Sequence, residues 1–291
     1  MISYRAWVDP ARRWDPCFEL GGATHRGRTH ERNEDAVALR HGHRAGLPYA
    51  VLVVCDGVTS SSRGDLAAAI GADAAADAVV AHLGGAADAD TALDPDRRQH
   101  LLRTAVHLAH EAVCAATIEQ LADRDPPGTT LVAALVYDDR VDVAWVGDSR
   151  AYLLSPARVD QPGEMCVLLT HDHSWINLVV DRGEMSAAEA ASAPLAHAIT
   201  RCIGPLHNPD PAQPAEVSQS HSVVTPGSHL VLCSDGVWGY AESPAEFCRL
   251  MGDIPAGASA GDVAASLVAG ALERCSEDDM TAAVTFVGQE G

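Results

Sequence analysis

The order of apolar and polar positions along the chain predicts separate blocks of strands and helices. Apolar runs typical of buried or half-buried strands occur at residues 36–39, 49–54, 129–137, 141–146, 151–154, 165–169, 221–224, 229–233 and 281–287. Helical spacing and helix-start signals occur at residues 65–82, 97–121, 243 onward and 262–275. Neighbouring strands follow one another like hairpins, without regular alternation of strand and helix. This order predicts the α+β class, with largely antiparallel sheets and packed helices.

Local signals predict where several of the helices begin and which faces they bury. Asp65 is a plausible N-cap of the first helix, and Ser186–Glu189 and Ser243–Glu246 both have the spacing of a capping box. The rest of the segment 171–204 has the pattern of irregular structure. The face that we expect helix 97–121 to bury contains Leu101, Ala105, Leu108, Ala112 and Ala116.

The pattern contains no obvious linker, so we expect one domain over residues 20–288, preceded by an N-terminal extension at residues 1–19. With 291 residues, 47% of them hydrophobic, the chain is long enough to bury a large core. The N-terminal residues lack an apolar core of signal-peptide length, and no segment has 18 consecutive apolar residues. We therefore expect a cytoplasmic protein that does not bind a membrane.

Charge and composition exclude several classes of function. The chain has 40 acidic and 20 basic residues, a formal net charge of −20, which argues against nucleic acid as a partner. All the basic residues are arginine, so chemistry that needs a lysine, such as a Walker-type phosphate loop, a protein kinase or a pyridoxal Schiff base, is excluded. The acidity fits either a soluble surface or a site that collects cations.

The eight cysteines are scattered and form no C-x-x-C pair. This distribution argues against a disulfide framework or a zinc site and favours a reducing compartment.

Carboxylates stand at the ends of several predicted strands. Asp56 ends one apolar run, Asp148 interrupts a second, Asp235 ends a third, and Asp278 with Asp279 precedes the last. Each could be an ordinary turn residue. If packed sheets bring them to one rim, however, they repel one another unless a hard divalent cation such as Mg²⁺ or Mn²⁺ lies between them. Two such ions close together could activate water for attack on phosphorus.

Seven motifs, in this order, resemble the metal-dependent serine/threonine protein phosphatases of the protein phosphatase 2C (PPM) type. They are GRTHERNEDA at 27–36, VVCDGV at 53–58, GTTL at 128–131, VGDSRAYLL at 146–154, LTHDHS at 169–174, LCSDGVW at 232–238 and EDDMT at 277–281. The resemblance implies a four-layer α/β/β/α sandwich of two antiparallel sheets flanked by helices. It also implies two manganese or magnesium ions, and in bacterial members a third, in a cleft at one end.

The resemblance assigns metal-binding roles residue by residue. Asp56 matches the bridging metal ligand, Gly57 the ligand that binds through its carbonyl, and Asp235 and Asp278 the other direct ligands. Glu34 and Asp35 match acidic residues that hold metal-bound waters, although by themselves they would suit a solvated loop. Asp148 matches a ligand of the third ion.

The chain departs from the family pattern at three places. His30 occupies the position of an arginine that grips the substrate phosphate, and Arg28 or Arg32 are possible substitutes. Val58, Thr59 and Ser60 replace a glycine pair. Val58 also stands where some relatives have a histidine that acts as a general acid. We therefore expect His30 or a metal-bound water to protonate the leaving group. The pair Asp278–Asp279 replaces the usual Asp-Asn. His171 and His173 suit substrate contact or the surface better than zinc.

We therefore expect a monomeric phosphatase that acts on phosphoserine and phosphothreonine in proteins. Direct attack of a hydroxide that bridges the two metal ions is the implied mechanism. A pseudophosphatase that keeps the fold as a binding module is the main alternative, supported by His30 and the lost glycines. A calcium-stabilised β protein is the third.

Overall fold

The computed structural model describes residues 2–6, 16–85, 92–120, 125–156, 165–207, 216–241, 243–252, 257–274 and 277–289. Its strands form two antiparallel sheets. The six-stranded sheet has the order β1 (Ile2–Ala6), β2 (Pro16–His25), β11 (Met280–Gln289), β10 (His229–Cys233), β7 (Arg150–Ser155) and β8 (Met165–Leu168). The five-stranded sheet has the order β3 (Asp35–Arg44), β4 (Leu47–Asp56), β5 (Leu131–Tyr137), β6 (Arg140–Val146) and β9 (Ser218–Val223).

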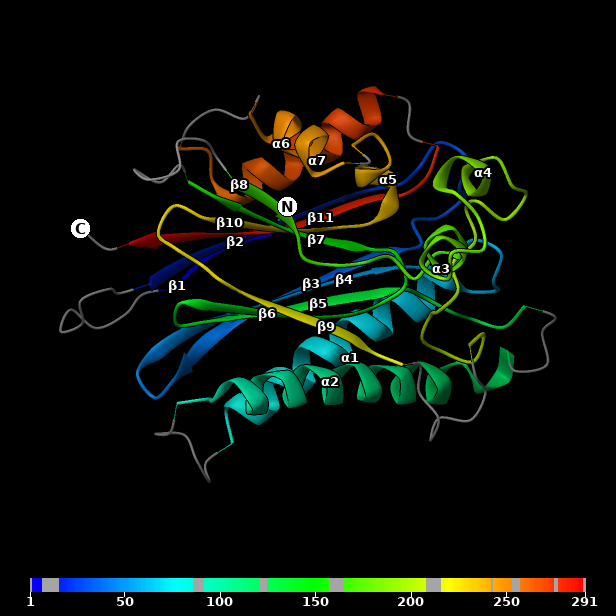
Figure 1. Ribbon diagram of the computed structural model, residues 1–291. Helices are drawn as coiled ribbons and strands as arrows, with labels where there is room; N and C mark the ends of the chain where they lie inside the picture. The colour runs from blue at the N-terminus through cyan, green and yellow to red at the C-terminus, as the bar shows by residue number, and fades with distance from the viewer. Residues whose placement is uncertain are drawn as a thin grey trace.

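The two sheets lie face to face, and helices cover both outer faces (Figure 1). Helices α1 (Gly64–Leu83) and α2 (Pro95–Ala116) lie on the five-stranded sheet, while α5 (Asp235–Trp238), α6 (Pro244–Gly252) and α7 (Ala260–Glu273) lie on the six-stranded sheet. The predicted α+β class and four-layer sandwich are therefore confirmed.

Strand β4 shows why an uninterrupted apolar run ends in a carboxylate. Its side chains alternate between two cores: Val51 and Val53 pack toward the helices, and Leu52 and Val54 pack between the sheets. Because both faces are covered, every residue from Leu47 to Cys55 is buried. The strand ends at Asp56, where the chain leaves the sandwich.

The predicted hairpin at 138–140 and both capping boxes are present. The first helix is capped differently from the prediction: Arg63, with a left-handed φ of 58°, is the N-cap, and Asp65 lies in the first turn and pairs with it. Helix α1 is long and apolar enough to cross a membrane, which is weak evidence of a membrane span because its buried face packs on the sheet.

The buried face of α2 is also shifted from the prediction. Leu108 is 43% exposed, whereas Leu102, Val106 and Val113 pack in the core beside Leu101. Helix α2 ends at Ala116, and a short 3-10 helix, η2 (Ile118–Gln120), follows. The predicted ends of this helix at Leu121 and of the last helix at Cys275 lie outside the described residues.

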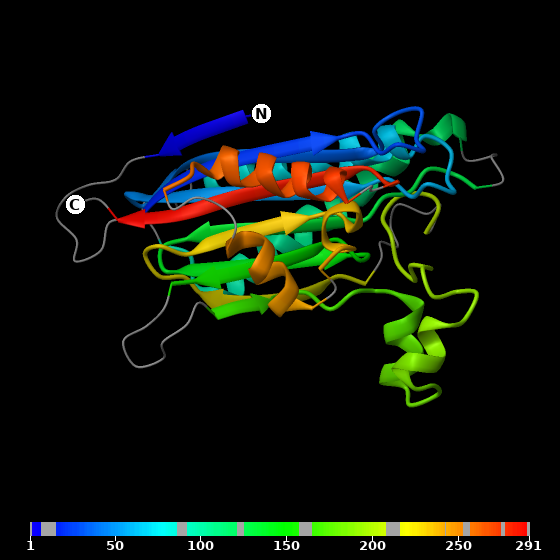
Figure 2. The same ribbon diagram turned by 90° about the horizontal axis from the view of Figure 1, so that it is seen from above.

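Two short helices that the apolar pattern did not predict, α3 (Trp175–Asp181) and α5, accompany the predicted α4 (Ala187–Ala191). Helices α3 and α4 lie beyond one end of the sheets, as both ribbon views show (Figures 1 and 2). We call residues 171–207 the flap segment. At the N-terminus, β1 pairs with β2 as an edge strand, and the predicted boundary between residues 19 and 20 falls inside β2.

Candidate metal centre

The strand ends of both sheets meet at one cavity. Asp56 and Gly57 follow the buried run of β4, Asp148 lies in the turn from β6 to β7, Asp235 follows β10, and Asp278 precedes β11. All five residues line a cavity of 780 Å³. The structure thus brings together the predicted direct ligands from distant parts of the sequence.

The backbone around Asp56 is held in place by neighbouring threonines and by close packing. Thr129 Oγ1 and the Thr130 amide both donate to the Asp56 carbonyl, at 2.9 and 2.8 Å. The Gly57 amide donates to the Glu34 carbonyl at 2.9 Å. A Cβ at Gly57 would lie 2.7 Å from that same oxygen, so a larger residue would push the strand end away from the loop before β3.

The carboxylates of the cavity raise one another's pKa. Burial and then the charges of Asp235, Asp35 and Asp148 raise the pKa of Asp56 well above its usual value. Burial followed by the charge of Asp235 raises the pKa of Asp148 to about 8. Burial and the charge of Asp278 raise the pKa of Asp235 to about 6, against a hydrogen bond with Asp56 that lowers it. The cluster therefore favours protons or cations over bare charge.

The donor set fits hard divalent cations. Among the residues that the structure describes, Asp235 Oδ1 is buried without a hydrogen-bond partner. A buried, unpaired carboxylate oxygen is costly unless a cation compensates it. The surrounding donors are carboxylate oxygens and the Gly57 carbonyl, which are the ligand types that Mg²⁺ and Mn²⁺ bind.

Glu34 and Asp35 lie behind this cavity and not among its lining residues. Asp35 is paired in register with Asp56, and its Oδ2 accepts from Ser234 Oγ at 2.7 Å. Burial raises the pKa of Asp35 to about 8. Glu34 is half-buried, and its side chain lines a neighbouring pocket of 330 Å³ together with His30 and Arg32.

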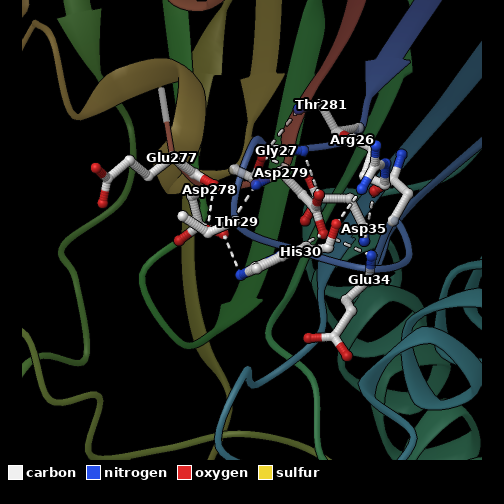
Figure 3. A network of polar contacts seen from close by, with 12 residues as sticks. Arg26, Gly27, Thr29, His30, Glu34, Asp35, Glu277, Asp278, Asp279 and Thr281 are labelled. Atoms are coloured by element: carbon white, nitrogen blue, oxygen red, sulfur yellow. Dashed lines mark hydrogen bonds and ion pairs between the residues drawn. The ribbon is translucent and has the colours of Figure 1, made fainter. Parts of the chain in front are cut away.

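His30 and Arg28 belong to the loop between β2 and β3. The His30 ring lies between two carboxylates: Nδ1 is 2.9 Å from Asp279 Oδ2, and Nε2 is 3.7 Å from Asp278 Oδ1 (Figure 3). Burial lowers the pKa of His30, but the hydrogen bond and charge of Asp279 outweigh burial and raise it. Arg28 donates to the Leu272 carbonyl at 3.3 Å, at the end of α7. Neither side chain is among the described residues that line the 780 Å³ cavity.

Asp279 organises that loop. Its buried carboxylate accepts from the amides of Gly27 and Glu34, each at 2.6 Å, in addition to the contact with His30. A buried carboxylate that receives two backbone amides is held firmly in one position. The second aspartate of the Asp278–Asp279 pair therefore fixes the loop that carries Glu34 and His30.

A buried cation supports the Asp148 turn. The Arg150 guanidinium binds Asp172 through Nε and Nη2, at 3.0 and 2.7 Å, and lies 3.5 Å from the centre of the Trp238 ring. Trp238 in turn donates through Nε1 to the Asp148 carbonyl at 3.0 Å. This arrangement ties the six-stranded sheet, the start of the flap segment and α5 together.

The two histidines of THDHS have different environments. His173 is buried, accepts from the Gly147 amide at 3.0 Å and lies 2.9 Å from Ser218 Oγ. Burial lowers its pKa to about 4, so the ring is neutral. His171 is exposed and pairs with Asp181 at 2.8 Å. The surface prediction is right for His171 and wrong for His173, which anchors the Asp148 turn.

The flap segment supplies an arginine and two histidines of the cavity lining that the sequence did not predict. His197, Arg201 and His207 line the cavity together with Asp56, Asp148, Asp235 and Asp278. Arg201 Nη2 also pairs with Glu216 at 3.1 Å, and its Nη1 lies 3.3 Å from His173 Nε2. The irregular pattern of this segment contains no signal that places Arg201 opposite carboxylates from other parts of the chain.

Comparisons with known proteins agree with this architecture. The family model for protein phosphatase 2C matches residues 22–273. A protein phosphatase 2C-type protein of Streptococcus pyogenes is 36% identical over 110 residues, which are 38% of this chain and 39% of that relative. The serine/threonine phosphatase stp of Listeria innocua is 30% identical over 216 residues, 74% of this chain and 75% of that protein. The chain thus matches less than half of the first relative's length and three quarters of the second's.

Solved structures show the same fold. The serine/threonine phosphatase Stp1 of Staphylococcus aureus superposes with a TM-score of 0.71 at 24% identity, covering 97% of this chain and 99% of that one. The catalytic domain of the serine/threonine protein phosphatase PstP, in complex with two manganese ions, gives a TM-score of 0.64 at 24% identity, covering 93% and 98%.

Proposed function

Because the chain belongs to the protein phosphatase 2C family, we propose that it hydrolyses phosphoserine and phosphothreonine in proteins with two divalent ions, Mn²⁺ or Mg²⁺. The observation that carries this proposal is the cavity in which Asp56, Asp235 and Asp278 converge from both sheets. The unpartnered Oδ1 of Asp235 within it supports a bound cation.

Each residue of the cavity has a distinct part in this proposal. Asp56 would be the ligand shared by the two ions, and the Gly57 carbonyl, Asp235 and Asp278 would be the remaining direct ligands. When bound, the ions supply an activated water and neutralise charge on the phosphate. Glu34 and Asp35 orient water from behind, and Asp148 offers a site for a third ion.

The flap segment provides the contact with the phosphate. Among the residues that the structure describes, Arg201 is the arginine that lines the cavity with the carboxylates, and a guanidinium can bind two phosphate oxygens. Val58 lines the same cavity and has no proton to give, so the leaving alkoxide takes its proton from water. The phosphate contact and proton donation predicted for His30, and the substitute role of Arg28, remain predictions.

The test is hydrolysis of a phosphothreonine peptide and of p-nitrophenyl phosphate with Mn²⁺. The variants Asp56→Ala and Asp235→Ala should abolish turnover, and Asp139→Ala, a change at a half-exposed turn carboxylate, should not. Circular dichroism checks that the inactive variants are folded. Full activity in either site variant contradicts the assignment.

The same assay separates the pseudophosphatase alternative, because a binding module would bind Mn²⁺ without turnover. Calcium in place of Mn²⁺ tests the third alternative, a calcium-stabilised β protein. The proposal includes a phosphoprotein partner and a cytoplasmic monomer, and the oligomeric state is checked by light scattering.

A further inference from the structure

We propose that His30 is a nitrogen ligand of the divalent cation held by Asp278, and that Asp279 orients its ring. The inference rests on the metal-dependent function proposed above. It assigns a donor to the metal centre that the strand-end carboxylates do not supply.

The three side chains form a compact group of donor atoms. One ligand atom of each, from His30, Asp278 and Asp279, lies within 4.8 Å of the other two. The His30 side chain is 13% exposed and that of Asp279 is 2% exposed, whereas Asp278 is 41% exposed and lines the cavity. The ring therefore lies between the buried Asp279 carboxylate and the more exposed Asp278 carboxylate (Figure 3).

Asp279 determines which nitrogen of His30 is available. Its carboxylate, held by the amides of Gly27 and Glu34, faces Nδ1 at 2.9 Å. A carboxylate accepts hydrogen bonds, so the proton of the neutral ring lies on Nδ1 and the lone pair lies on Nε2. Metal-binding histidines commonly show this arrangement, in which one nitrogen donates to a carboxylate and the other binds the ion.

The position of Nε2 suits a shared ion. Its distance of 3.7 Å to Asp278 Oδ1 is too long for a hydrogen bond. Two donors that each lie about 2.1 Å from one ion can be separated by up to about 4.2 Å. Both atoms are therefore within reach of one cation, and a shift of less than about 1 Å brings them to the separation of about 3.0 Å that neighbouring octahedral ligands have.

The role predicted from the sequence, a contact with the substrate phosphate, needs the same Nε2. The two roles differ in what they do to metal selectivity. An imidazole nitrogen increases the preference for Mn²⁺ and Co²⁺ over Mg²⁺, which strongly prefers oxygen. A phosphate contact leaves the metal affinity unchanged.

The direct test is proton NMR of the full chain loaded with Co²⁺. A histidine that binds Co²⁺ through Nε2 and keeps its Nδ1 proton gives a strongly shifted, solvent-exchangeable resonance. We expect this resonance in the wild type and in His207→Gln, and its loss in His30→Gln. Its absence in the wild type at full Co²⁺ occupancy, or its loss in His207→Gln instead, overturns the proposal.

If His30→Gln does not fold, ¹⁵N labelling of the histidines in the wild type gives the same answer. The ring nitrogens of one histidine must then show the large change in chemical shift that bound Co²⁺ causes. Calorimetry gives a second readout: His30→Gln should weaken Mn²⁺ binding about tenfold or more and Mg²⁺ binding less. Equal Mn²⁺ affinity contradicts the proposal. If wild-type turnover and Co²⁺ binding are intact and the resonance is missing, only this inference fails; if Co²⁺ does not bind, the proposed function fails with it.

Discussion

The two sides of the cavity are built in different ways. The carboxylate side contains strand ends whose backbones are hydrogen-bonded to the neighbouring strand, such as Asp56, held by Thr129 and Thr130. The opposite side consists of the flap segment, with short helices and exposed apolar side chains, for example Leu195 at 52% exposure. A metal centre needs donors fixed to a fraction of an ångström, and substrate contacts tolerate more movement. We therefore expect the two sides to respond differently to substitution.

The largest effect is expected on the carboxylate side. Asp235→Asn removes a charged ligand and should lower kcat on a phosphopeptide by at least about 10²-fold. It also removes one charge from a repelling cluster, so the melting temperature of the metal-free protein should not fall. Differential scanning calorimetry with EDTA measures this, and a large destabilisation would show that Asp235 is needed for the fold.

Arg201→Ala tests the flap side. Loss of a charge-assisted hydrogen bond of about 1.5–3 kcal/mol should raise KM for the phosphopeptide roughly 10- to 100-fold. Mn²⁺ affinity should stay the same, because Arg201 is not a ligand. Arg182→Ala, at an exposed arginine of the same segment that pairs with Glu184, is the matched control. A change in Mn²⁺ affinity without a change in KM would contradict the division between the two sides.

His173 connects the two sides and should make stability depend on pH. Its pKa is about 4 in the folded protein against 6.5 as the ordinary value. The neutral ring therefore stabilises the fold above about pH 6.5, and this contribution is lost as the pH falls toward 4. Over this pH range the free energy of unfolding should fall about 2 kcal/mol less in His173→Gln than in the wild type. Urea titrations of both proteins with EDTA measure the difference, and parallel pH profiles would contradict it.

The smallest effect is expected at the exposed surface of the flap segment. Leu195→Ser should change the free energy of unfolding by less than about 0.5 kcal/mol, because a half-exposed side chain loses little burial. Its kcat on p-nitrophenyl phosphate should be unchanged. A large fall in the melting temperature would show that this part of the flap segment packs as firmly as the sheets.

Much of the fold could be predicted because local sequence and packing agree. The apolar runs of β4 and β5 are short and rich in valine, and a polar turn joins β5 to β6, so their patterns favour buried strands. The faces of α2 were harder to predict, because Leu108 has the same spacing as its buried neighbours and only the sheet beneath decides which side is covered. Helix α5 has four residues, too few for a periodic signal.

For the candidate metal centre, the sequence by itself predicted which residues would meet: aspartates at the ends of apolar runs, and a glycine after the first, all of which line one cavity. Those residues are identifiable because their chemistry is local. Only the tertiary structure decided that Asp279 contacts His30, that Asp35 pairs in register with Asp56, and that Arg201 lines the same cavity as the carboxylates. Such relations depend on distances between segments up to 249 residues apart. Sequence periodicity contains no measure of these distances, because packing of the two sheets and their loops sets them.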